Sequence, residues 1–173
     1  MPLRRLIPLV IVCLLAATAS AQGATQPKPT EIAPFSLMLG RWAGEGWTST
    51  GPKKRISYRQ TEVIAAKADG NVITVEGTGH DPKTKKVVFA AFATIAYNDQ
   101  GKLRWTAYSG GNALSVAPKI TDNTFIWGFA VEGGQVRYTI TLTKMSWHEI
   151  GEFSPDGGKS WFPTLEMDLT KTP

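Results

Sequence analysis

The functional group in this sequence that is best placed to take part in a reaction is the carboxyl group of Glu149. It lies in an alternating stretch, Ser146 to Phe153, where it shares a face with Trp147 and Phe153. A carboxylate on an apolar face is costly unless it pairs with a cation, holds a proton or borders a water-filled cavity. A bulge that turns Glu149 outward is an equal alternative. If it faces inward, Glu149 is a candidate acid or base for an isomerisation or a hydrolysis.

Other residues on apolar strand faces could line the same cavity. Gln60 shares a face with Ile56 and Tyr58. Aromatic residues at inward positions form either a packed core or the wall of a binding site, and in a small barrel the two functions can coincide. We predict a ligand-binding set that consists of Tyr58, Gln60, Phe89, Trp105, Trp127, Tyr138, Trp147 and Glu149. No catalytic residue is assigned within it.

Other kinds of site have little support. His148 follows the inward Trp147 and is expected to face outward, although a role as a haem or metal ligand stays open. The chain has no His-Glu-x-x-His pattern, no clustered carboxylates, no Gly-x-Ser-x-Gly elbow and no glycine-rich phosphate loop that leads into a helix. We therefore predict neither a metal nor a cofactor.

The start of the chain has the three parts of a secretory signal peptide. Arg4 and Arg5 precede an apolar run from Leu6 to Ala17, and Ala19-Ser20-Ala21 forms a small-residue cleavage site. The run is too short to span a bilayer as a stable helix, which takes about 20 residues. We expect cleavage after Ala21 and a periplasmic or extracellular protein with no membrane span. Residues 22–34 contain three prolines and are expected to form a flexible leader.

Charge and cysteine content narrow the choice of partner. The full chain of 173 residues carries a formal charge of +5, and without Arg4 and Arg5 this falls to +3. Its densest basic groups, around Lys54 and Lys85, fall in predicted hairpin loops rather than along an aromatic stripe. Nucleic acid is therefore not an expected partner.

The only cysteine, Cys13, lies inside the signal peptide, so the mature protein is expected to have no disulfide. Its oligomeric state is left open.

The rest of the chain, residues 35–173, is predicted to be one all-β domain. Alternating apolar segments recur with short turns between them, and no long segment keeps a helical period. About ten strands are expected, at residues 40–47, 54–67, 71–79, 86–97, 102–109, 114–118, 125–131, 135–144, 146–153 and 160–170. The most hydrophobic of them, residues 86–97, is expected to be buried on at least one face throughout. Closure into a single up-and-down antiparallel barrel would leave no exposed sheet edge. A β-sandwich is the alternative.

Two local motifs should shape this domain. In the first strand, Gly44 and Gly46 clear one face for close approach by another backbone, and Trp42 is expected to plug one end of the barrel. Residues 154–161 match the Asp-box pattern Ser-x-Asp-x-Gly-x-Ser/Thr-Trp, in which Asp156 should hold a hairpin turn through local hydrogen bonds. Both motifs are interpreted as structural.

The segment around Gly40-Arg41-Trp42 resembles the opening Gly-x-Trp signature of the calycins, which include lipocalins and fatty-acid-binding proteins. The wider layout is similar to a bacterial family of uncharacterised secreted calycin-like barrels. The features that carry this resemblance are residues 39–47, residues 69–77 and the closing turn at residues 154–161 with the strand after it. The resemblance implies the barrel shape and, as in lipocalins, a basic residue packed on the first-strand tryptophan, for which Lys171 is the candidate.

Three functions remain as hypotheses. The first is a non-enzymatic barrel that binds a small, largely apolar molecule. The second is an enzyme on the same barrel that uses Glu149 as its acid or base. The third is a structural or interaction protein whose interior is filled with side chains. The volume and polarity of the interior distinguish them.

Overall fold

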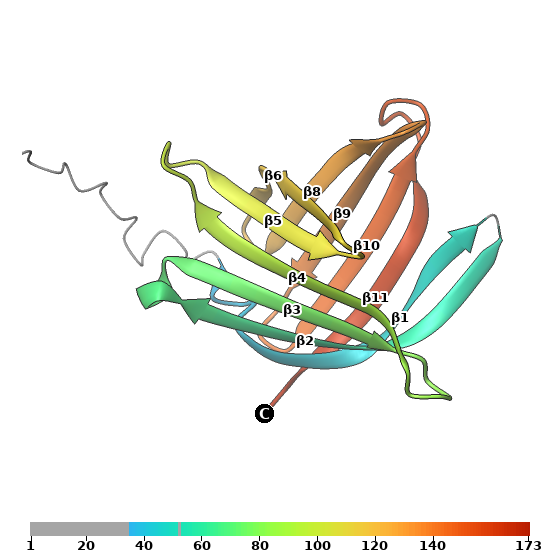
Figure 1. The fold of residues 1–173 in the computed structure, drawn as a ribbon, viewed down its shortest axis with the longest axis horizontal. Helices are drawn as coiled ribbons and strands as arrows, with labels where there is room; N and C mark the ends of the chain where they lie inside the picture. Colours follow the sequence, from blue (N-terminus) through green and yellow to red (C-terminus); the bar gives the residue numbers. More distant parts are fainter. Residues whose placement is uncertain (1–34, 52) are drawn as a thin grey trace, which may run out of the picture.

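The computed structural model describes residues 35–51 and 53–173, and these residues form one antiparallel sheet of eleven strands (Figure 1). The strands are β1 (Gly40–Gly51), β2 (Lys54–Lys67), β3 (Val72–His80), β4 (Val87–Tyr97), β5 (Leu103–Ser109), β6 (Asn112–Val116), β7 (Lys119–Thr121), β8 (Thr124–Val131), β9 (Gly134–Leu142), β10 (Ser146–Ser154) and β11 (Phe162–Thr172). A short 3-10 turn, Ala68–Gly70, joins β2 to β3. The predicted all-β antiparallel class is confirmed, and the predicted signal peptide and leader lie outside the described residues.

The strands follow one another around the sheet in chain order. The order is β6-β5-β4-β3-β2-β1-β11-β10-β9-β8-β7, so β1 and β11 pair and bring the two ends of the domain together. In Figure 1 the green and yellow strands β2–β5 cross over the orange and red strands β9–β11, so the sheet curls into a half-barrel.

The prediction of a closed barrel of about ten strands is wrong. The sheet has eleven strands and stays open between β6 and β7, which are consecutive in the chain but share no ladder. The predicted strands omitted β7, which has only three residues. Ala117 and Pro118 join the two edges, and proline has no backbone N–H for a ladder hydrogen bond. Short edge strands beside a proline limit pairing at this opening.

Trp42 lies in the buried core near the start of β1, which is compatible with its expected place at one end of the barrel. Its side chain is buried, packs edge-on against Trp147 with 5.8 Å between ring centroids, and donates a hydrogen bond from Nε1 to the carbonyl oxygen of Met38 at 2.7 Å. That carbonyl belongs to a tight turn in which the Met38 N–H donates to the Phe35 carbonyl oxygen at 2.9 Å. Outside the tryptophan, the Lys171 ammonium lies 4.9 Å from the ring centroid of Trp42. The contact expected between the last strand and this tryptophan is present.

The two glycines of β1 allow the close approach that their spacing predicts. A Cβ atom on Gly44 would collide with the carbonyl oxygen of Asp168 on β11. On Gly46 it would lie 2.7 Å from the carbonyl oxygen of Glu166 on the same strand. The two ends of the domain therefore pack backbone against backbone where β1 meets β11.

The Asp-box turn between β10 and β11 also has the predicted structure. One carboxylate oxygen of Asp156 accepts hydrogen bonds from the N–H groups of Lys159 and Ser160, at 3.0 and 2.8 Å, and from the hydroxyl of Ser154 at 2.9 Å. These bonds hold the pKa of the exposed Asp156 carboxyl below its usual value. Its role in the described structure is local and structural.

The start of β4 departs from the prediction of continuous burial. Val87, Val88 and Phe89 are all exposed, at 58%, 47% and 43%. These residues have β3 on one side, but the pairing of β4 with β5 begins only at Ala91. The first residues of β4 therefore extend beyond the part that pairs with β5, and they have little to pack against.

Candidate functional site

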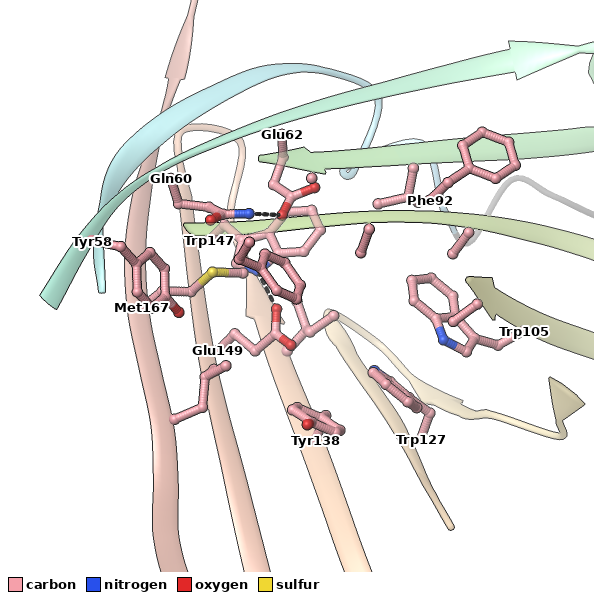
Figure 2. Close-up of a pocket in the computed structure, with 18 residues that line it drawn as sticks. Tyr58, Gln60, Glu62, Phe92, Trp105, Trp127, Tyr138, Trp147, Glu149 and Met167 are labelled. Atoms are coloured by element: carbon pink, nitrogen blue, oxygen red, sulfur yellow. Dashed lines mark hydrogen bonds between the residues drawn. The ribbon is translucent and has the colours of Figure 1, made fainter. Parts of the chain in front are cut away.

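The concave side of the half-barrel holds a cavity of about 190 Å³ (Figure 2). Its lining includes all eight residues of the predicted set, namely Tyr58, Gln60, Phe89, Trp105, Trp127, Tyr138, Trp147 and Glu149. The remaining lining residues are Glu62, Val75, Gly77, Ala91, Phe92, Ala93, Ala107, Ile140, Leu165 and Met167. The structure thus brings the predicted residues together, while their role in binding a ligand stays a prediction.

Strand alternation explains why these side chains converge. Residues two apart point to the same face of a strand, so β2 presents Tyr58, Gln60 and Glu62 together, and β10 presents Trp147 and Glu149. In sheet order, β2 and β10 are separated by β1 and β11. It is the curl of the sheet that turns their inner faces toward the same space.

Aromatic rings form the opposite part of the wall. Trp127 of β8 stacks on Tyr138 of β9 with ring centroids 4.3 Å apart, and Trp105 of β5 lies 5.3 Å from Trp127. Phe89 is 43% exposed and therefore lies at the rim rather than in the interior. The cavity has a continuous aromatic side and, as Figure 2 shows, a cluster of polar side chains from β2 and β10.

Two buried carboxyl groups form the centre of the polar cluster. Glu149 faces inward and is 7% exposed, so the outward alternative is wrong, and Glu62 is 6% exposed. Trp147 Nε1 donates a hydrogen bond to Glu149 Oε2 at 3.2 Å, and Gln60 Nε2 donates one to Glu62 Oε1 at 2.7 Å. Among the described residues, no lysine, arginine or histidine lines this cavity.

The surroundings of these carboxyl groups favour their protonated forms. Burial raises the pKa of Glu149 to about 8, and the nearby charge of Glu62 adds to this effect, while the hydrogen bond from Trp147 opposes it. Burial also raises the pKa of Glu62 to about 7, against the opposing hydrogen bond from Gln60. Burial, followed by the charge of Glu149, raises the pKa of both Tyr58 and Tyr138. No cation among the described lining residues pairs with Glu149, so of the three ways to accommodate it inward, retention of a proton and contact with the cavity remain.

Several polar atoms around the cavity have no hydrogen-bond partner within the described part of the chain. They are the acceptors Gln60 Oε1 and Glu62 Oε2 and the indole donors Trp105 Nε1 and Trp127 Nε1. Buried polar groups in folded proteins are nearly always paired with protein, water or a ligand, so these atoms mark where a partner from outside the chain would bind. A bound molecule with polar groups of its own could supply the missing partners.

Glu62 was missed by sequence reasoning. The alternation that places Ile56, Tyr58 and Gln60 on one face of β2 continues directly to Glu62. Extending the pattern by one more pair of residues would have found it. The missed residue matters because it makes Glu149 one member of a carboxyl pair.

His148 lies on the opposite face of β10, as expected, and does not line the cavity. Its Nδ1 atom lies 2.7 Å from Asp168 Oδ1. Glu166 is near enough that one ligand atom from each of the three residues falls within 4.8 Å of the others. His148 therefore cannot ligate a molecule bound in the cavity without a change of face.

Comparison with known proteins supports the fold alone. No protein-family model matches the chain, and no curated protein sequence matches it. The crystal structure of Rv2717c from M. tuberculosis is similar, with a TM-score of 0.62 and 11% sequence identity over 82% of this chain and 97% of that chain. The fold and the cavity together define a class: an antiparallel β-barrel-like protein with an aromatic-walled interior. Within residues 35–51 and 53–173, no helix has the length and apolar character to cross a membrane.

Proposed function

We propose that this protein binds a small, largely apolar molecule in the cavity of its half-barrel. The observation that carries the proposal is a space of about 190 Å³ between aromatic side chains on one side and a few polar groups on the other. Binding sites for small molecules are typically apolar pockets with a small number of placed polar groups. A barrel filled for structural purposes alone would leave no such space.

The cavity volume limits the size of the ligand. An engineered apolar cavity of about 150 Å³ accommodates benzene, so the present cavity suits a molecule with one ring or a short branched chain. Removal of roughly 150 Å² of apolar surface from water would contribute about 4 kcal/mol before the costs of association. A lone cavity of this size is too small to enclose a whole long-chain lipid or a haem.

Titration with neutral one-ring compounds tests this proposal directly. Benzyl alcohol should change the tryptophan fluorescence, because Trp105, Trp127 and Trp147 line the cavity. Indole has the same fluorescence as the tryptophan side chain, so its binding is measured by calorimetry. The substitution Ala91→Leu adds three carbon atoms at a lining position and should weaken binding. Ala90→Leu adds the same atoms at the neighbouring exposed position and should leave binding unchanged. If neither these compounds nor charged one-ring compounds of the same size bind, or if Ala91→Leu has no effect on binding, the proposal is wrong.

An acid–base enzyme is the second candidate, and the pair of buried carboxyl groups favours it. Groups whose pKa values lie near neutrality can both give and take a proton at physiological pH. Any compound that binds should be incubated with the protein and followed by NMR for isomerised or hydrolysed products. For an enzyme, Glu149→Gln should abolish turnover and leave the affinity for neutral ligands intact. An absence of product with every bound compound would favour the carrier.

We further propose that the protein is an exported member of the calycin-like barrels. The signal-like residues 1–21 support export, and the contact of Lys171 with Trp42 supports the calycin resemblance. Protein from the envelope of its native host should begin at or near Gln22. Recovery of a chain that retains Met1 would contradict export.

A further inference from the structure

We propose that the cavity selects a small organic cation, an ammonium group carried on one aromatic ring, with the ammonium held between Glu62 and Glu149. This inference deepens the proposed function, since it assumes that the cavity binds a small ligand. It assigns the charge of that ligand, which cavity volume and apolar lining leave open.

With both carboxyl groups ionised, the polar cluster of β2 and β10 offers more acceptors than donors, whereas the unpaired donors Trp105 Nε1 and Trp127 Nε1 belong to the aromatic wall. Each carboxyl group receives one hydrogen bond from a neighbouring side chain, from Gln60 for Glu62 and from Trp147 for Glu149. Glu62 Oε2 and Gln60 Oε1 then remain buried with no donor in the described part of the chain. An ammonium group has up to three N–H donors, which matches this requirement.

None of the described residues that line the cavity carries a positive charge. Arg59 directly precedes Gln60 in β2, so its side chain points to the opposite face. On that face its Nε atom lies 3.5 Å from Glu45 Oε1, and both side chains are exposed. The titratable groups that face the cavity are Glu62, Glu149, Tyr58 and Tyr138, all neutral or negative. Burial makes ionisation of the carboxyl groups unfavourable, and a bound cation would offset that cost.

The aromatic wall is compatible with a cation as well as with a ring. The negative faces of tryptophan and tyrosine attract ammonium groups, and desolvation strengthens this attraction. The Trp127–Tyr138 stack offers a flat surface for the aromatic part of the ligand. In contrast, a carboxylate ligand such as a fatty acid would enter a space whose described lining contains two acidic groups and no lysine, arginine or histidine.

A matched set of ligands tests the inference. Benzylamine, benzyl alcohol and benzoate are close in size and differ in charge at about pH 7 to 8. We expect benzylamine to bind at least about tenfold more tightly than benzyl alcohol, a difference of about 1.4 kcal/mol, and benzoate to bind most weakly. Because the cation favours the ionised carboxyl groups, calorimetry in two buffers of different ionisation enthalpy should detect proton release on benzylamine binding.

Conservative variants assign the effect to the carboxyl pair. Glu149→Gln and Glu62→Gln keep the shape of each side chain and should each reduce the preference for benzylamine over benzyl alcohol severalfold, measured as the ratio of the two affinities. Glu45→Gln removes an exposed charge and should change neither. If benzyl alcohol binds as tightly as benzylamine, or if both cavity variants retain the preference, the inference is wrong and the proposed function stands. If none of the three compounds binds, the proposed function itself fails.

Discussion

At the scale of single residues, the buried carboxyl pair is a feature that opposes the stability of the described structure. Glu62 and Glu149 are both buried and have no cationic partner among residues 35–51 and 53–173. They are close enough for the charge of Glu62 to raise the pKa of Glu149. A sequence selected for stability alone would place apolar residues here, as replacement of buried charges often shows. Local rules of folding are most often broken at functional sites, which is why these residues carry the proposals above.

The first prediction is that folding stability decreases as pH rises. Burial raises the pKa of Glu149 from 4.5 to about 8 and that of Glu62 from 4.5 to about 7, so folding favours the protonated forms. Their contribution is therefore complete below the unfolded-state pKa of 4.5 and is lost as pH rises through the folded-state values. The slope should reach up to about 1.4 kcal/mol per pH unit for each group.

Urea unfolding at about pH 5, 7 and 9 measures this slope. Glu149→Gln imitates the protonated side chain, so it should match wild type at low pH and exceed its stability at high pH. Glu45→Gln, on an exposed side chain, should follow wild type at every pH. Wild-type stability that rises between about pH 5 and 9 would contradict the assignment.

At the scale of secondary-structure elements, the pairing of β1 with β11 depends on glycines. Gly44 and Gly46 let the two strands pack where side chains would prevent contact, and this pairing joins the two ends of the domain. Gly77 on β3 differs, since an added Cβ there would lie 2.6 Å from Glu62 Oε1, at the end of a side chain rather than at backbone. A flexible side chain can move away more easily than a strand.

The second prediction compares Gly44→Ala with Gly77→Ala. The first introduces a methyl group against the backbone of β11 and should destabilise the protein by about 1–3 kcal/mol or more. The second needs only a shift of the Glu62 side chain and should cost less, although it should weaken ligand binding. Chemical denaturation of both variants measures the difference, and equal stabilities would show that β11 can adapt to a side chain at residue 44.

At the scale of the whole molecule, the core of an open half-barrel must be covered from solvent by segments outside the sheet. At one end this is the turn Phe35–Met38, which precedes the first strand and packs inside the curl of the sheet. Phe35 is 1% exposed and meets Phe125 of β8 edge-on, with ring centroids 5.8 Å apart. A segment outside the sheet therefore links β8 to Trp42 and stabilises the arrangement.

The third prediction is that Phe35→Ala destabilises the whole domain. Removal of a fully buried phenylalanine ring should cost about 3–5 kcal/mol, through lost burial and the cavity left behind. Phe162→Ala, at a position that is 55% exposed, should change stability by less than about 0.5 kcal/mol. The two melting temperatures give the comparison. A similar small loss in both would mean that the turn is not part of the folding unit.

The sequence by itself was sufficient for most of the strands and for the direction of most side chains. Alternation is a local property, so it placed Tyr58, Gln60, Tyr138 and Trp147 on inner faces, and the turn residues set most strand limits within a few positions. The Asp-box turn and the glycines of β1 were also predictable, because their requirements concern the backbone close by.

Only the tertiary structure decided how far the sheet curls and where it stops. The gap between β6 and β7, the exposure of Val87–Phe89 and the volume of the cavity all depend on which strands lie side by side. So does the meeting of Glu62 with Glu149, which are far apart in the chain and on strands that do not pair. Alternation tells which face of a strand a side chain occupies, but the curvature of the sheet determines which faces meet across the interior.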